Sequence, residues 1–139
     1  MIQMRNEERT LFWELNNVEQ GIIEVNASGI LDSKSSRLQH EEALDYAKRL
    51  NSFLFLLDYR DIRADATLLR VYELPVIYHE LGVPRRSKIA IVLPQVKSAE
   101  EDYEFYETVC YNRGYEVRLF EEKKHALDWL RLQKNNYRL

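Results

Sequence analysis

Phe53-Leu54-Phe55-Leu56-Leu57 decides the class of fold, because this run of apolar residues contains no polar alternation. A strand with one face in water alternates apolar and polar residues, whereas an unbroken apolar run is typical of a strand buried on both faces. Ile89-Ala90-Ile91-Val92-Leu93, bounded by Pro94, has the same character. The two runs therefore predict neighbouring parallel strands at the centre of a sheet that helices cover on both sides.

The chain before Phe53 predicts a β-hairpin followed by a helix. Apolar residues alternate at about residues 10–15, and Ile22 to Ile30 is rich in β-branched residues, so both segments are expected to be strands. Asn16-Asn17 and Gln20-Gly21 supply turn residues between them. Ser36-Arg37-Leu38-Gln39 fits a capping box, which predicts that a helix begins there.

Helices are also expected around the second apolar run. Asp65 suits the cap of a helix that Pro75 kinks or splits. A helix is also expected over residues 99–113. Its acidic first residues would be stabilised by the positive end of the helix dipole, and Gly114, just after its end, can take the left-handed conformation that often ends a helix. Residues 116–120 alternate like an edge strand, and a last helix follows, marked by Ala126, Leu127 and Leu130.

The order β-β-α-β-α-β-α-β-α predicts one α/β domain over residues 1–139. Its mixed five-stranded sheet starts with the N-terminal hairpin, continues as βα repeats and is flanked by about four helices. The polar residues 1–8 are expected to form a flexible N-terminus. No linker, repeat or low-complexity segment divides the chain.

The composition limits the cellular locations and the classes of partner that are expected. Apolar residues make up 45% of the 139 residues and charged residues 31%, which is typical of a folded domain. The formal net charge of −3 gives no overall attraction to nucleic acid, so nucleic acid is not an expected partner. No apolar run approaches the ~20 residues of a membrane span. With one cysteine, Cys110, and no apolar signal-peptide segment at the start, a cytoplasmic location is expected.

Several segments carry a resemblance to a known family. They are Gly29-Ile30-Leu31-Asp32 after the second strand, Leu57-Asp58 before a helix, Lys88 to Val92, Asn112 to Phe120, and Ala126 to Leu130. Over nearly its full length the chain resembles the STAS (SpoIIAA-like) family of anti-sigma-factor antagonists, and within it a bacterial branch of unassigned function. The resemblance implies the fold predicted above.

The same resemblance implies a regulatory role with one departure. In anti-sigma-factor antagonists a serine that follows an aspartate, at the start of the helix after the third strand, is phosphorylated by a partner kinase. Here Asp65 matches the aspartate, but Ala66 stands at the acceptor position and the motif's glycine is missing. Thr67 is the nearest hydroxyl. The chain therefore lacks the usual phosphoacceptor serine.

The best candidate for a ligand or partner surface is the charged segment after the central strand, consisting of Asp58, Arg60, Arg63, Asp65 and Thr67. Its arginines and the free backbone amides at a helix start would suit an anion. The alternative is a solvated loop without a function, whose charges pair with each other. Asp58, at the carboxyl end of a parallel strand, would also suit a receiver-type phosphoacceptor. That chemistry needs further carboxylates to hold Mg²⁺, and the first strand ends without an acidic pair, so a structural or hydrogen-bonding role is favoured.

No catalytic residue, metal site or cofactor is predicted. His40, His79, His125 and Cys110 are scattered without metal-ligand spacing, and four separated glycines form no phosphate-binding loop. Cys110 is expected to be a buried, unreactive thiol. The cluster Arg85-Arg86-Ser87-Lys88 is short and not interleaved with aromatic residues, which argues against nucleic-acid binding.

Three functions remain open at this point. The first is a non-enzymatic regulatory or protein–protein interaction module, since the pattern is a complete fold without a catalytic set. The second is a domain that binds a small apolar ligand or lipid, suggested by the family's kinship with lipid carriers and by the apolar helices around Pro75. The third is an enzyme with Asp58 in its cleft. A homodimer is compatible with each of them.

Overall fold

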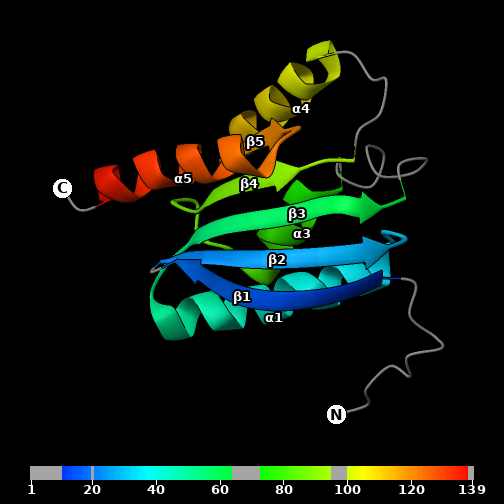
Figure 1. Ribbon diagram of the computed structural model, residues 1–139, viewed down its shortest axis with the longest axis horizontal. Coiled ribbons are helices and arrows are strands. Elements are labelled where there is room, and N and C mark those ends of the chain that lie inside the picture. Colours follow the sequence, from blue (N-terminus) through cyan, green and yellow to red (C-terminus); the bar gives the residue numbers. More distant parts are fainter. Residues whose placement is uncertain (1–10, 20, 64–72, 95–99, 138–139) are drawn as a thin grey trace.

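A five-stranded mixed sheet forms the centre of the molecule, as the computed structural model shows for residues 11–19, 21–63, 73–94 and 100–137 (Figure 1). The order of the strands along the sheet follows the order of the sequence. The first two strands are antiparallel and the remaining neighbours are parallel, which confirms the predicted hairpin and parallel centre. The strands are β1 (Leu11–Glu19), β2 (Ile22–Gly29), β3 (Leu54–Ile62), β4 (Lys88–Val92) and β5 (Glu116–Phe120).

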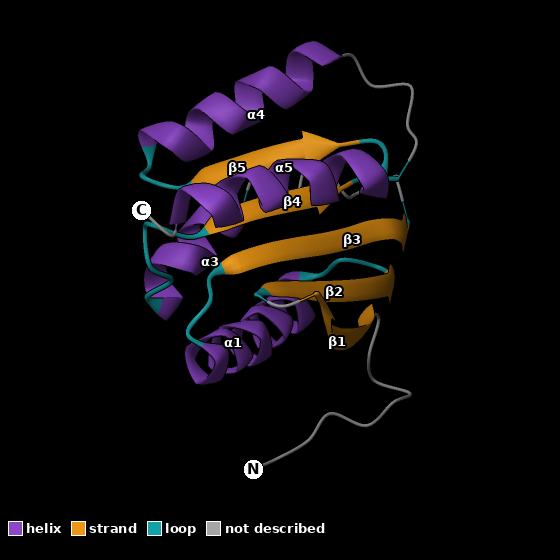
Figure 2. Ribbon diagram, turned by 60° about the vertical axis from the view of Figure 1, so that its left-hand side comes forward, coloured by secondary structure: helices purple, strands orange, loops and turns teal. Residues whose placement is uncertain are grey.

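Helices cover the sheet unequally on its two sides (Figures 1 and 2). Helices α1 (Ser33–Leu50), α3 (Leu74–Leu81) and α4 (Glu100–Asn112) pack on one face, whereas α5 (Lys123–Tyr137) lies on the other. Helix α5 packs mainly on β3, β4 and β5, and it reaches β1 and β2 at Glu19, Ile22 and Glu24. The part of this face around Phe12 and Asn26 has no helix over it within the described residues. The described part of the chain thus has the predicted four helices.

Strand β3 is buried on both faces, as its unbroken apolar run predicted. Phe55 and Leu57 lie in the larger core beneath α1, α3 and α4. Leu54 and Leu56 lie in a smaller core with Ala126, Leu130 and the inward residues of β4. These side chains alternate between the two cores because successive residues of a strand point to opposite faces.

The opening hairpin is longer than predicted. We expected the first strand at about residues 10–15 and turn residues at Asn16-Asn17, but β1 continues to Glu19. Asn16 lies opposite Glu24 and Asn17 opposite Ile23, so both asparagines belong to the sheet. The reversal of the chain therefore comes later, next to Gly21, whose φ of 91° is readily available only to glycine.

Helix α1 begins earlier than the predicted capping box. Its N-cap is Asp32, whose side chain accepts a hydrogen bond from the amide of Ser35 at 2.9 Å. Ser36 lies within the first turn and is buried, and the side chain of Gln39 is hydrogen-bonded to the hydroxyl of Tyr59 instead of reaching back to a cap. The capping-box prediction at Ser36 was wrong because Asp32 supplies the cap one turn earlier.

Pro75 neither kinks nor splits the helix that the structure describes. It lies in the first turn of α3, where no intrahelical bond requires its missing amide hydrogen. Gly82 ends α3 in the left-handed conformation. The predicted helix cap at Asp65 and the predicted flexible residues 1–8 lie outside the described residues.

Candidate functional site

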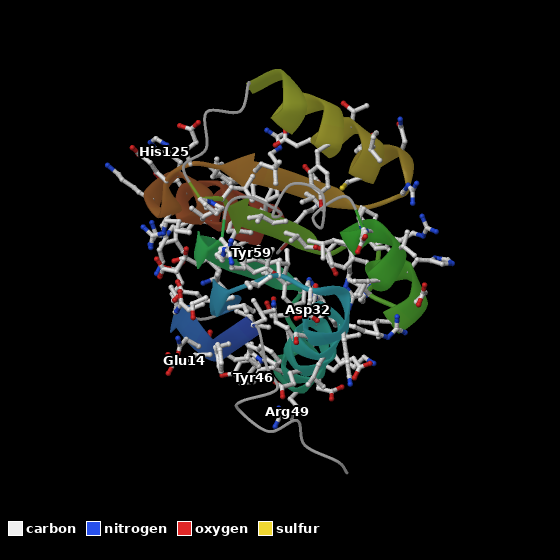
Figure 3. The ribbon with its side chains drawn as sticks, turned by 90° about the vertical axis from the view of Figure 1, so that its right-hand side faces the viewer. Glu14, Asp32, Tyr46, Arg49, Tyr59 and His125 are labelled. Carbon is white, nitrogen blue, oxygen red and sulfur yellow. The ribbon has the colours of Figure 1, made fainter. Side chains whose placement is uncertain are left out.

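Charged side chains gather on β2 and β3, on the face of the sheet that α5 covers only in part. Figure 3 looks toward the carboxyl ends of these strands, with Glu14 of β1 and His125 of α5 on the same side of the sheet. Four residues, Glu24, Asp58, Arg60 and Lys123, form what we call the β2–β3 charge cluster. It lies on β2 and β3 next to Lys123, the first residue of α5.

Asp58 and Arg60 form a two-pronged ion pair. They lie two residues apart in β3 and so point to the same face. Nε of Arg60 donates to Oδ1 of Asp58 at 2.9 Å, and Nη2 donates to Oδ2 at 2.8 Å. Parallel pairing of β3 with β4 ends at Asp58, but β3 itself continues to Ile62. The prediction that a loop follows Leu57 was therefore wrong, because Asp58, Asp61 and Ile62 still pair with β2.

The Asp58 carboxylate is held in its ionised form. Burial, which leaves the residue 7% exposed, would by itself raise its pKa. The hydrogen bonds and charge of Arg60, together with the charge of Lys123, outweigh burial and lower the pKa of Asp58 below its ordinary value. The same ion pair raises the pKa of Arg60. A paired carboxylate of lowered pKa is poorly suited to acid–base work, so the enzyme hypothesis loses the residue on which it rested.

Glu24 is a functional candidate that the sequence reasoning missed. It lies on β2 with 3% exposure, where its Oε1 accepts a hydrogen bond from Nδ2 of Asn26 at 2.7 Å. Nζ of Lys123 lies 2.5 Å from its other carboxylate oxygen. An acidic residue inside the otherwise apolar run from Ile22 to Val25 was the available signal, since a buried strand tolerates a charge only with a partner. Glu24 thus ties the start of α5 to β2.

Of the other three predicted surface residues, the structure describes one. Arg63 follows β3 directly and is exposed, and its amide donates to the carbonyl of Gly29 at 2.8 Å. Asp65 and Thr67 lie outside the described residues. The structure therefore joins Asp58 to Arg60 and places Arg63 at the end of the same strand.

An irregularity in β3 adds one more charge to this face. The pairing of β2 with β3 shifts between Asn26 and Ser28, so that β3 contains one residue more than β2 over this stretch. Asp61 consequently lies opposite Ser28. Its carboxylate contributes to the raised pKa of Arg60, after the larger effects of Asp58. The bulge thus brings an exposed carboxylate close to the buried carboxylates of the charge cluster.

A shallow groove lies beside the cluster on the part of the sheet without a helix. Its volume is about 250 Å³, and its lining includes Phe12, Glu14, Asn26, Ser28 and Asp61. We call these five residues the β1–β2 groove. Phe12 is a large apolar side chain that is 43% exposed, and the lining around it is mixed, with Trp13 and Ala27 beside the polar residues. Aromatic side chains at a polar rim are enriched where proteins bind one another.

The larger core contains a small cavity between α1, α3 and the sheet. It is lined by apolar side chains together with His40 and Tyr78, and its volume is about 20 Å³. That is room for about one water molecule. The cavity is too small for an apolar ligand or a lipid chain, so it gives no support to the second function considered above.

Among the described residues, the remaining side chains form no arrangement that suits catalysis or metal binding. Cys110 is buried, and burial raises the pKa of its thiol to about 11, as expected for an unreactive cysteine. Across the described ranges, no group of three or more His, Cys, Asp and Glu side chains could hold a metal ion. In the same ranges, no helix is long and apolar enough to cross a membrane.

Comparison with known proteins decides the fold. No protein-family model and no curated protein matches the sequence. The structure is similar to the crystal structure of an anti-sigma factor antagonist from Mycobacterium paratuberculosis, with a TM-score of 0.53, over 87% of this chain and 94% of that one. The chain has a STAS-like fold. Because the two sequences are 13% identical, the likeness to this STAS-like structure concerns the fold.

Proposed function

We propose that this chain is a non-enzymatic regulatory module that binds a partner protein through the β1–β2 groove. The observation that carries the proposal is the uneven cover of the sheet. Helix α5 covers the Ile22 end of β2, whereas the groove of about 250 Å³ around Phe12 and Asn26 contains no described residue of α5, and Phe12 is exposed there. An exposed aromatic residue with a polar rim is the usual form of an interaction surface.

The charge cluster is better suited to binding a partner than to catalysis. Asp58 and Glu24 are buried carboxylates with cationic partners, so their positions are held. Asp61 and the half-exposed Arg60 extend this polar network toward solvent beside the groove. Charges that are held in place at a rim set the orientation and the choice of a partner.

The STAS-like fold supports a particular kind of partner. The similar structure is named an anti-sigma factor antagonist, so an anti-sigma-factor-like regulator in the cytoplasm is the partner class that we propose. Ala66 stands where that family has its phosphorylated serine, so we propose that the interaction is controlled without a phosphoserine at this position. Self-association through the same groove is the competing outcome.

Site-specific photo-crosslinking in the native host tests the proposal. A photoreactive phenylalanine analogue replaces Phe12, and a matched control replaces Leu132, which is 62% exposed on α5. We expect one discrete crosslinked protein from position 12 and none from position 132. Crosslinking of equal strength at both positions, or none at position 12, would overturn the proposal. A product of twice the chain's mass would replace it with a homodimer, which light scattering would verify.

A further inference from the structure

Arginine side chains gather at the opposite end of the sheet, where α3 and α4 end and β4 and β5 begin. The basic segment Arg85-Arg86-Ser87-Lys88 lies there, and its members differ in their surroundings. Ser87 is fully buried, and Nζ of Lys88 lies 2.5 Å from a carboxylate oxygen of Glu116. Arg85 and Arg86 are exposed. The exposed charge of this segment therefore lies on its two arginines.

Arg85 is held in one place despite its exposure. Its Nη1 donates to the carbonyl of Arg113 at 3.1 Å, and its guanidinium carbon lies 5.8 Å from the centre of the Tyr115 ring. The guanidinium lies directly against Gly114, where an added Cβ would come within 1.8 Å of Nη1. An arginine fixed in this way loses less conformational entropy when it binds a ligand.

Arg113 and Arg86 extend the positive surface around Arg85. Arg113 is exposed and belongs to the turn that Arg85 contacts. Arg86 packs over the Phe53 ring, with 4.6 Å from its guanidinium carbon to the ring centre. The sequence places Arg113 far from Arg85, so only the fold brings these two residues together. We call Arg85, Arg86 and Arg113 the arginine patch.

Two members of the patch form no ion pair with a carboxylate of the described residues, a property that they share with Arg49 and Arg118. Arg37, Arg60 and Arg131 each form an ion pair. Over the ranges that the structure describes, Arg85 and Arg113 form none. Their guanidinium groups therefore keep donors that no internal carboxylate uses.

A purely structural role explains part of this arrangement. A cation near the end of α4 is favourable because of the helix dipole, and the Arg85 side chain satisfies one carbonyl there. That role uses one N–H of a group that carries five. It does not involve the side chain of Arg113, which is exposed in the same turn.

We propose that the arginine patch binds an acidic segment of a partner protein. Fixed guanidinium groups match carboxylates with two parallel hydrogen bonds each, which favours aspartate and glutamate side chains. The chain's net charge of −3 opposes a long polyanion such as nucleic acid, whereas a short acidic peptide contacts the patch alone. The patch lies at the other end of the strands from the charge cluster, so this proposal stands independently of the β1–β2 groove.

Titration of the ¹⁵N-labelled protein with a hexaglutamate peptide tests the proposal by NMR. We expect saturable shifts of the Arg85, Arg113 and Gly114 amides. The double variant Arg85→Glu/Arg113→Glu should weaken binding by about tenfold or more, because two attractive contacts become repulsive. Lys124→Glu, an exposed charge reversal on α5, is the control and should bind like the wild type.

Each outcome decides the question. Because Arg85 also contacts the α4–β5 turn, Arg113→Glu alone serves as a second variant that leaves this contact in place, and it too should weaken binding. No shift at the patch, or an equal effect of Lys124→Glu, would overturn the proposal. Tighter binding of a single-stranded hexanucleotide would show a nucleic-acid site instead. Inorganic phosphate that produces the same shifts with equal affinity would reduce the patch to a simple anion site.

Discussion

Acid should destabilise this protein through His40. The side chain lies within the larger core, 7% exposed, and its Nδ1 is hydrogen-bonded to the carbonyl of Ser36 at 2.7 Å. Burial disfavours the charged imidazolium and lowers the pKa of His40 from 6.5 to about 4, although the hydrogen bond to Ser36 acts in the opposite direction. The folded protein therefore takes up a proton at this site less readily than the unfolded chain.

The size of the effect follows from this difference in pKa. As the pH falls below 6.5 the unfolded chain binds the proton, and the folded protein does so only near pH 4. Stability from this group is complete above pH 6.5 and is lost as the pH falls toward 4. The free energy of unfolding should fall by about 2 kcal/mol between neutral pH and pH 5, and by about 3 kcal/mol at pH 4.

Urea unfolding at several pH values between 7 and 5 measures this loss. His40→Gln removes the titrating group, and His40→Phe serves if the glutamine disturbs packing. Either variant should have a pH dependence of unfolding that is shallower by about 2 kcal/mol over this range, whatever its stability at neutral pH. His79→Gln changes an exposed histidine and should keep the wild-type slope. Equal slopes for wild type and both His40 variants would refute the reasoning.

Two further predictions concern the backbone near α4 and β5. Gly114→Ala should lower the free energy of unfolding in urea by about 1 to 2 kcal/mol or more, because φ is 94° and the new Cβ displaces the Arg85 guanidinium. The control Gly82→Ala has open space around its new Cβ, so it should cost only the backbone strain. A smaller loss at Gly114 than at Gly82 would contradict this. Glu107 accepts the amide hydrogen of Leu119 at 2.8 Å, so Glu107→Ala should speed hydrogen exchange of that amide by about tenfold, whereas Glu107→Gln should not. Unchanged exchange in the alanine variant would count against the contact.

The fold could be predicted where burial leaves a mark on the sequence. The run from Phe53 to Leu57 contains no polar residue because both faces of β3 are covered. The boundaries were less predictable, since Asp32 and Ser36 both suit an N-cap and their local sequences do not decide between them. The length of β1 depended on pairing with β2, because its asparagines are more typical of turns.

The candidate site could be predicted only in part. Asp58 and Arg60 were singled out because they follow an apolar strand, and their contact would have followed from strand spacing if the strand had been extended beyond Leu57. The pairing of Glu24 with Lys123 joins β2 to α5 across most of the chain. No local pattern contains that information, because the crossovers of the whole sheet bring these residues together.

The agreement between strand order and sequence order has a consequence for synthesis on the ribosome. Each new strand finds its neighbour already made, so the sheet grows at one edge as the chain emerges. Helix α5, which covers Leu54, Leu56, Ala90 and Val92, is made after all five strands. Until then this apolar strip stays in contact with water, and chaperones that bind nascent chains would find their target there.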